Sequence, residues 1–181
     1  GSEMCIRDRI EAAGIELESE TDSEVAAHLL ALAYNEGETA GDFQASALKV
    51  LSRLDGAFTV LFVHDDHPGT IVAGRRSTPL IVGVGEGEMF LGSDVAAFID
   101  RTKNAVELGQ DNAVVITADS YDIYDFDGNP VEGKPFTIDW DLDAAQKDGF
   151  DSFMMKEIHE QPAAVRDTLA GHFDGRRIAV S

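Results

Sequence analysis

The sequence is poor in several residue types on which common protein classes depend. One cysteine among 181 residues permits neither an intrachain disulfide framework nor a zinc cluster of cysteines. No apolar run approaches the roughly 20 residues of a membrane span, and no signal-peptide pattern is visible. Basic residues are scarce, with 14 against 34 acidic ones and a formal net charge of -20, so polyanions are repelled. We expect a globular cytoplasmic protein that binds neither nucleic acid nor membrane.

Four short apolar runs stand between turn signals in residues 54–94. They are rich in Val, Ile, Phe and Thr, and each is too short for a helix of ordinary length. The runs cover residues 57–63, 70–74, 80–84 and 89–92. We predict that they form one continuous antiparallel sheet. Its more buried side chains should be Phe58, Val60, Phe62, Ile71, Ile81 and Phe90.

Helical periodicity precedes this region. Residues 23–35 and 43–54 repeat apolar side chains at helical spacing, and Thr21 and Glu24 stand at capping-box spacing before the first of these segments. We expect the two helices to form a layer on the sheet, which gives an α/β fold class of the α+β kind. Shorter elements are predicted as strands at 15–19, 105–108, 113–118 and 121–126, and as a helix at 95–99.

The first residues differ in character from the rest. Residues 1–9 are polar and aperiodic, and we interpret them as a non-native leader. Residues 10–14 resemble the last turn of a helix that ends on a glycine cap. Since the beginning of that helix is not in the sequence, we expect the chain to be a fragment.

The pattern changes again near the C-terminus. Residues 136–150 lose periodicity and carry many acidic side chains, whereas a helical pattern begins at Ser152. Its apolar residues fall on one stripe, which consists of Phe153, Met154, Ile158, Val165 and Leu169. Pro162 is expected to break or kink this last helix after Gln161. The predicted division is a first domain at 10–138, a linker at 139–151 and the start of a second domain at 152–181.

Histidines and aspartates form the sequence HDDH at residues 64–67, a spacing that can hold a metal ion at a hairpin tip. A proline and a glycine follow directly, so a solvated turn explains the same residues, and we favour the turn. Cys5 has the chemistry of a nucleophile, but it lies in neither a strand nor a glycine turn that would hold it in a pocket.

Two other patterns resemble ligand loops only in part. Asp139, Asp141 and Asp143 match the first positions of a calcium loop. Ala144 and Phe150 then replace the required glycine and glutamate, so we expect no metal site. A series of glycines at 83, 85 and 87 leads into a strand and carries two glutamates, so we interpret them as turn residues and not as a phosphate loop.

Asp22 is the remaining candidate for a functional side chain. It lies where the chain enters the helix at residues 23–35, and a carboxylate at a helix N-terminus is favoured by the helix dipole. The same carboxylate can bind an ammonium group. From composition alone, the structural and the binding role of Asp22 both stay open.

Four segments carry a resemblance to a known family. They are ESETDSEVAAHLL at 18–30, LDGAFTVLFV at 54–63, RRSTPLIVGVGEGEMFLGSD at 75–94 and MMKEIHEQP at 154–162. Together they resemble the glutamine:fructose-6-phosphate aminotransferases (isomerizing), or glucosamine-6-phosphate synthases. SETD before a helix is shared by class II glutamine amidotransferases more widely, whereas KEIHEQP after such a domain is much more specific to this family.

The resemblance implies an N-terminal nucleophile hydrolase fold, an αββα sandwich truncated at its N-terminus, for residues 10–138. It implies the first helix of a sugar isomerase (SIS) domain from residue 152. The implied reaction converts D-fructose 6-phosphate and L-glutamine to D-glucosamine 6-phosphate and L-glutamate, in a homo-oligomer, a dimer, without a cofactor. Asp22 matches the aspartate that holds the α-amino group of glutamine.

The family's nucleophilic cysteine, its Asn-Gly oxyanion hole and its isomerase residues match no position of this sequence. We therefore expect no catalytic residue here, and a fragment that is inactive alone. Two alternatives stay open beside this interpretation. One is a nonenzymatic acidic interaction domain whose C-terminal helix docks on a partner. The other is the glutaminase part of another class II amidotransferase, such as a phosphoribosyltransferase, against which KEIHEQP argues.

Overall fold

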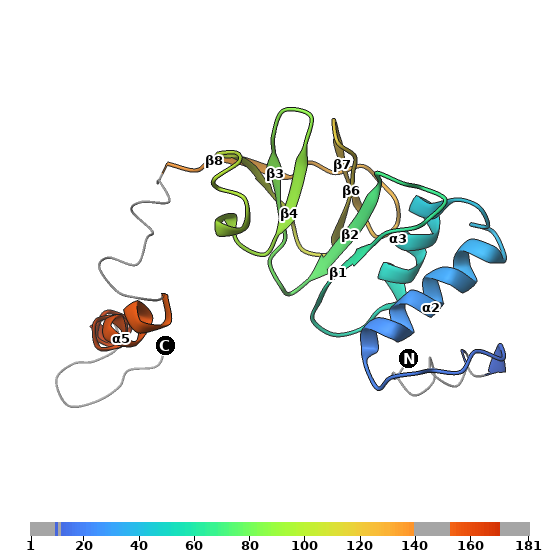
Figure 1. The fold of residues 1–181 in the computed structure, drawn as a ribbon, viewed down its shortest axis with the longest axis horizontal. Helices are drawn as coiled ribbons and strands as arrows, with labels where there is room; N and C mark the ends of the chain where they lie inside the picture. The colour runs from blue at the N-terminus through green and yellow to red at the C-terminus, as the bar shows by residue number, and fades with distance from the viewer. Residues whose placement is uncertain (1–9, 11, 140–152, 171–181) are drawn as a thin grey trace. The chain divides into compact units, whose positions relative to one another are not determined.

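The computed structural model describes residue 10 and residues 12–139 and 153–170. The chain divides into two compact units, one that ends at Asp139 and one that begins at Trp140. The first unit contains a pair of helices and two four-stranded sheets (Figure 1). No helix among the described residues has the length and apolar character needed to cross a membrane.

Two helices form the outer layer of the first unit. Helix α2 (Asp22–Asn35) begins after Thr21, whose side chain accepts a hydrogen bond from the Glu24 amide at 3.4 Å. Helix α3 (Phe43–Arg53) is capped by Asp42, which accepts from the Ala45 amide at 2.9 Å. Such caps satisfy amides that have no partner inside the helix. Both predicted helices are confirmed within two residues of their ends.

The first sheet lies directly under these helices. It contains β1 (Phe58–Phe62), β2 (Ile71–Arg76), β6 (Asn112–Ile116) and β7 (Tyr121–Asp125), all antiparallel, in the order β1-β2-β6-β7. The buried faces of α2 and α3 share one apolar cluster with Phe62, Val72 and Ala113 of this sheet. Burial of these side chains is the main force that holds the helical layer on the strands.

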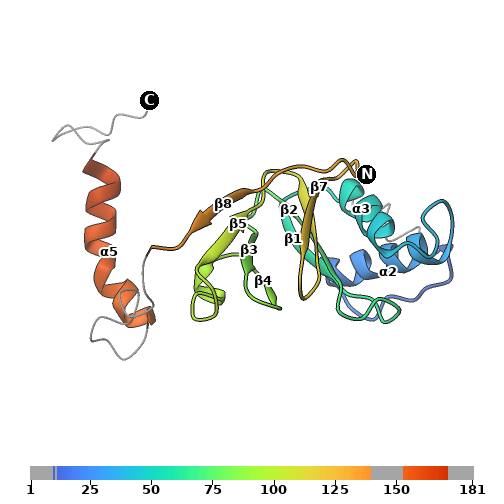
Figure 2. The same cartoon turned by 90° about the horizontal axis from the view of Figure 1, so that it is seen from above.

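The second sheet lies on the other side of the first. Its strands are β3 (Ile81–Val84), β4 (Met89–Gly92), β5 (Asn104–Glu107) and β8 (Lys134–Thr137), in the order β4-β3-β5-β8. Figure 2 shows the resulting sequence of layers, with the helices, then the first sheet, then the second sheet. A second apolar cluster joins the two sheets through residues such as Ala73, Val114 and Val82.

The prediction of one continuous sheet across residues 57–92 is wrong. All four predicted strands form, but β1 and β2 belong to the first sheet and β3 and β4 to the second. The chain leaves the first sheet after Arg76, where Ser77 takes the left-handed backbone conformation with φ of 61°. Leu80 then enters the cluster between the sheets, with 1% of its surface exposed.

The predicted core side chains are buried to different degrees. Phe62 is 5% exposed and belongs to the core. The other five, Phe58, Val60, Ile71, Ile81 and Phe90, are half-buried. Phe98, which follows the short 3-10 helix η1 (Val95–Ala97), is fully buried and was not among the predicted residues.

Two local expectations need correction and one is confirmed. Residues 15–19 form no strand. Strand β8 was missed, because the predicted loss of periodicity began at Phe136, which pairs with Ala105 of β5. Gly14 has the positive φ of 78° that a glycine cap requires, and the amide of Ile15 bonds to the carbonyl of Ile10.

Helix α5 (Phe153–Ala170) is the described part of the second unit. The helix continues through Pro162. Of the two predicted outcomes after Gln161, a break or a kink, the break is therefore wrong. Its predicted apolar stripe is exposed at Met154 (69%), Ile158 (48%) and Val165 (56%). The side chain of Leu169, a further member of that stripe, lies outside the described residues.

We expect the backbone amides of α5 to exchange hydrogen with solvent faster than those of β2 and β6. The reason is that α5 exposes apolar side chains, whereas Val72 and Val114 of the two strands are fully buried. Hydrogen exchange followed by mass spectrometry measures both. Equal protection of α5 and the two strands would show that the helix is anchored as firmly as the core.

Candidate functional site

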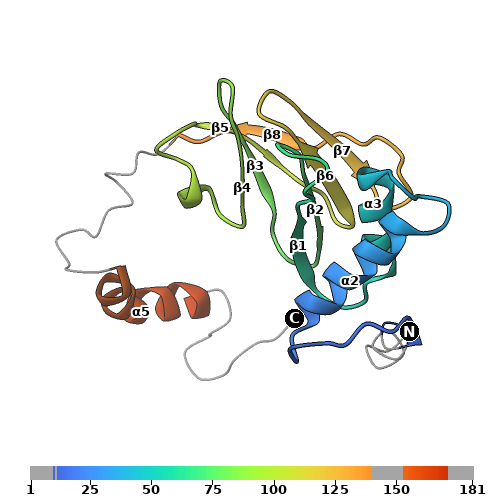
Figure 3. The same cartoon turned by 45° about the vertical axis from the view of Figure 1, so that its right-hand side comes forward.

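Asp22 occupies the first position of α2, next to the capping residue Thr21. Its side chain is exposed. It lines a cavity of about 310 Å³ to which α2 and β1 both contribute. That volume falls at the lower end of the range of small-molecule sites in proteins. Figure 3 shows the start of α2 beside β1.

The walls of this cavity, which we call the Asp22 cavity, come from three segments. Helix α2 contributes Asp22, Ser23, Val25 and Ala26, the loop before β1 contributes Leu54, Asp55 and Ala57, and β1 contributes Phe58, Thr59 and Val60. Two carboxylates thus stand on a wall that is otherwise mainly apolar. Such a combination suits a small cation, since the carboxylates attract an ammonium group.

Glu24 fixes the segment that leads into α2. Its carboxylate accepts hydrogen bonds from the amide of Glu18 at 2.7 Å and the amide of Ser19 at 2.8 Å, and from the Ser19 hydroxyl. His28, one turn later, lies 3.5 Å from the same carboxylate. The hydrogen bond from the Ser19 side chain, followed by that from Glu18, lowers the pKa of Glu24 from 4.5 to about 2.

The Glu24 contacts predict a pH-dependent effect of Glu24→Gln. A carboxyl group whose folded-state pKa is depressed stabilises the fold above its unfolded pKa, and this contribution is lost as the pH falls toward the folded value. The variant should therefore melt at a lower temperature than the wild type at neutral pH. The difference should shrink as the pH falls from 4.5 toward about 2.

Thermal unfolding over this pH range is the measurement, and Glu16→Gln is the matched control because Glu16 is exposed. If the melting temperature of Glu24→Gln stays below that of the wild type by the same amount at every pH, the ionised Glu24 carboxylate is not what stabilises the fold. An equal loss of melting temperature in Glu16→Gln would contradict that role as well.

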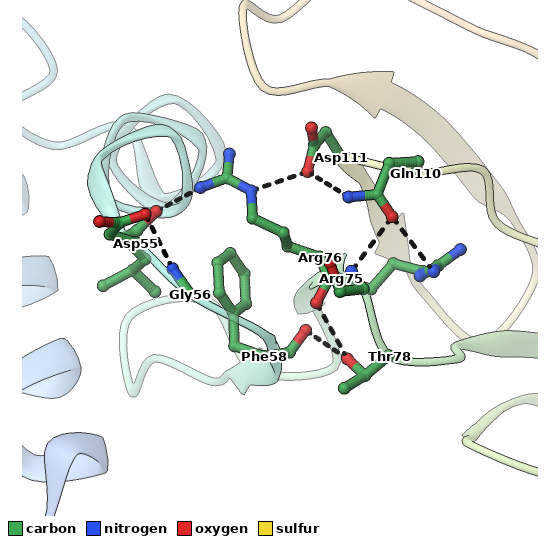
Figure 4. A network of polar contacts seen from close by, with 10 residues as sticks. Asp55, Gly56, Phe58, Arg75, Arg76, Thr78, Gln110 and Asp111 are labelled. Carbon is green, nitrogen blue, oxygen red and sulfur yellow. Dashed lines mark hydrogen bonds and ion pairs between the residues drawn. The ribbon is translucent and has the colours of Figure 1, made fainter.

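Arg76 of β2 holds the loop that forms one wall of the Asp22 cavity (Figure 4). Its guanidinium donates to the backbone carbonyl of Leu54 and, through Nε, to Asp111 Oδ1 at 2.8 Å. The same group lies 5.5 Å from the ring centroid of Phe58 and 5.3 Å from that of Phe126, distances at which cations are attracted to aromatic faces. Arg76 thereby fixes the position of Leu54, directly before Asp55.

Arg75, the neighbour of Arg76, fixes a second loop. It donates to the Leu108 carbonyl at 2.8 Å and to Gln110 Oε1 at 3.5 Å. Gln110 in turn accepts from the Ser77 amide and donates to Asp111 at 3.0 Å. The two arginines therefore hold the loops around β2 in place. The sequence of residues 75–94 did not predict this role.

The histidines at 64 and 67 lie in a turn, as predicted, and Asp65 and Asp66 between them are exposed, whereas the two histidines are half-buried. The ring of His64 packs 4.0 Å from Tyr34 and that of His67 stacks 5.5 Å from Phe43, measured between centroids. The Tyr34 hydroxyl donates to Asp66 and lies 3.1 Å from His67 Nε2. Burial, followed by the hydrogen bond to Asp66, raises the pKa of Tyr34. These side chains form an aromatic cluster that holds the turn against α2 and α3.

Other candidate sites of the sequence find no support as binding sites. Within the described ranges, no group of three or more His, Cys, Asp or Glu side chains is placed to hold a metal ion. Asp139 is exposed, whereas Cys5, Asp141 and Asp143 lie outside the described residues. Gly87, with φ of 67°, is a turn residue as predicted.

Another cavity, of about 470 Å³, lies between the turn after β1 and the turn before β4. Its one carboxylate, Glu88, is held by Arg101 through two hydrogen bonds of 2.8 and 2.9 Å. The Asp22 cavity is smaller, but within the part of the chain that the structure describes neither Asp22 nor Asp55 forms an ion pair with a basic side chain. We therefore regard the Asp22 cavity as the candidate binding site.

Asp55 is the site residue that sequence reasoning missed. It follows α3 in an Asp-Gly pair, a pattern that signals only a turn. Asp55 comes close to Asp22 only because the loop before β1 packs beside the start of α2. No local sequence pattern predicts such a long-range arrangement.

Comparison with known proteins gives close relatives. No family model matches the chain. It is 64% identical over 176 residues to the glutamine-fructose-6-phosphate aminotransferase (isomerizing) of Mycolicibacterium paratuberculosis, which covers 94% of this chain and 28% of the relative. The enzymes of the same name from Mycobacterium tuberculosis and Corynebacterium efficiens are 62% and 58% identical, over 97% and 93% of this chain. The chain spans less than a third of the length of these relatives.

A solved structure shares the fold. Glutamine phosphoribosylpyrophosphate amidotransferase from B. subtilis superimposes with a TM-score of 0.56 over 70% of this chain and 27% of its own, at 20% sequence identity. At that identity the likeness concerns the fold alone. It confirms the expected N-terminal nucleophile hydrolase fold, of which the described residues form one helical layer and both sheets.

Proposed function

We infer that the chain belongs to the glutamine-fructose-6-phosphate aminotransferase (isomerizing) family, and we propose that it is part of an enzyme that transfers the amide nitrogen of L-glutamine to D-fructose 6-phosphate. The products are D-glucosamine 6-phosphate and L-glutamate. The observation that carries the proposal is the 64% identity over nearly the whole chain to a relative of that name. We propose a cytoplasmic homo-oligomer, a dimer, for the complete enzyme.

Asp22 has a specific role in this proposal. Its carboxylate, favoured by the N-terminus of α2, would bind the α-ammonium group of glutamine at the edge of the Asp22 cavity. The cap at Thr21 and the Glu24 contacts fix the backbone on either side of it. Asp22 therefore holds and orients the substrate, and the nucleophile that cleaves the amide must come from elsewhere in the enzyme.

A chimera tests the proposal directly. In the Mycobacterium tuberculosis relative, the segment that matches this chain is replaced by residues 10–170 of this chain. Formation of glucosamine 6-phosphate from glutamine and fructose 6-phosphate by the chimera is then measured. Since the two are 62% identical over 180 residues, we expect the chimera to keep glutamine-dependent synthesis. A folded chimera that loses it would favour the nonenzymatic acidic interaction domain.

A further inference from the structure

The loop between α3 and β1 contains an Asp-Gly pair whose two residues are joined by a hydrogen bond. The amide nitrogen of Gly56 donates a hydrogen bond of 2.9 Å to Oδ1 of Asp55, the side chain of the preceding residue. Figure 4 shows this contact beside the Arg76 guanidinium. It places the side-chain carboxyl of Asp55 directly against the nitrogen of the following peptide bond.

We propose that Asp55 and Gly56 form a site of spontaneous aspartate isomerisation, which proceeds through a cyclic imide. The Gly56 nitrogen attacks the carboxyl carbon of protonated Asp55, a C–N bond forms, and the carboxyl C–O bond breaks. Water leaves with the hydroxyl of the carboxyl group and the amide proton. Hydrolysis then adds water to one of the two imide carbonyls, which gives either aspartate or isoaspartate.

Three features of the structure favour this reaction at position 55. The nitrogen and the carboxyl are already in contact, which removes much of the entropic cost of bringing them together. Both residues are exposed, so water can reach the imide. A Cβ at Gly56 would meet no atom within 4 Å, so the surroundings leave open space for the ring.

The pair Asp127 and Gly128 provides an internal comparison. Its glycine also has a positive φ, 87° against 91° at Gly56. However, the Gly128 amide donates to the backbone carbonyl of Asp125 at 3.1 Å, and the Asp127 amide donates to the Asp125 side chain. The Gly128 nitrogen is thus directed into the turn and away from the Asp127 carboxyl.

Isomerisation at Asp55 would change the main chain. Isoaspartate routes the backbone through the β-carbon and lengthens it by one methylene between α3 and β1. Asp55 lines the Asp22 cavity, and the adjacent Leu54 carbonyl is the acceptor for Arg76. The modification would therefore shift the wall of that cavity, although its occurrence depends only on the geometry of the loop and not on the proposed function.

The test follows isoaspartate in the 181-residue chain during incubation at neutral pH and physiological temperature. An isoaspartate methyltransferase with a labelled methyl donor marks the product, and peptide mapping with electron-transfer fragmentation locates it. We expect label at position 55 to accumulate about tenfold faster than at 127, as the preformed contact predicts. In denaturant the two rates should converge, since both sites are then flexible Asp-Gly pairs.

Glutamate variants are the matched controls. Asp55→Glu keeps the charge but requires a six-membered imide, which forms far more slowly, so it should abolish label at 55 and leave 127 unchanged. Asp127→Glu should do the reverse. Equal or faster labelling at 127 in the folded chain would overturn the proposal, as would a difference between the sites that persists in denaturant.

Discussion

Replacement of Phe98 by alanine is expected to lower the free energy of unfolding by about 3 to 5 kcal/mol. The side chain is fully buried, and its ring stacks on Phe90 with centroids 6.1 Å apart. It also fills the space above Gly83 of β3, where a Cβ would lie 2.6 Å from the Phe98 ring. Removal of the ring therefore opens a cavity on the outer face of the second sheet.

Denaturant unfolding of the 181-residue chain measures this effect. Phe98→Leu should cost less than alanine, because it leaves a smaller cavity. Leu61→Ala, at a position 48% exposed on β1, is the control and should cost under about 1 kcal/mol. Similar losses for Phe98→Ala and Leu61→Ala would contradict the burial assigned to Phe98.

A double-mutant cycle sharpens the test of this packing. Gly83→Ala alone should destabilise the fold, since its new Cβ has no room beside the ring of Phe98. In the Phe98→Ala background the same change should cost much less. The difference between the two costs reports the contact itself.

The helices of this fold were predictable because their signals are local. Thr21 and Asp42 are capping residues that stand before apolar residues at helical spacing, and the structure places caps at both positions. The β-strands around residues 54–94 were predictable for a similar reason, since turn residues bound each apolar run. These features lie within a few residues of one another in the sequence.

The partition of the strands into two sheets was not predictable from such signals. Strand β2 pairs with β1, its neighbour in sequence, but on its other side it pairs with β6 and not with β3. That choice depends on long-range burial between the sheets and on the turn at Ser77, a residue type that gives no warning of its positive φ. Strand β8 was hidden by its proline and by the acidic residues that follow.

The candidate site shows the same division. The position of Asp22 followed from a local motif, and the structure places it at the edge of a cavity. The place of Asp55 in the cavity wall and the contact of Arg76 with Leu54 depend on how α2, the loop after α3 and β1 pack together. A single sequence gives the residue types but not which distant residues share a wall.

On the proposed role of Asp22, Asp22→Asn in a full-length enzyme that contains this segment should lower kcat/KM for glutamine between about tenfold and a few hundredfold. The change keeps the approximate size of the side chain but removes the charge that we propose faces the substrate ammonium, and loss of one charge-assisted contact is worth roughly 1.5 to 3 kcal/mol. Because the ammonium group is remote from the amide that reacts, the ground state and the transition state lose this contact equally. The effect should therefore appear mainly as a higher KM.

Steady-state glutaminase kinetics measure the change, and isomerisation of fructose 6-phosphate in the same variant should stay close to the wild-type rate. Asp65→Asn is the matched control, since Asp65 is exposed in the turn after β1 and takes no part in the Asp22 cavity. The helix-dipole contribution of Asp22 is only about 0.3 to 1 kcal/mol, so the variant should stay folded. If Asp22 holds the substrate through its charge, removal of that charge must weaken substrate binding. An unchanged kcat/KM in folded Asp22→Asn enzyme would therefore limit Asp22 to a structural role at the start of α2.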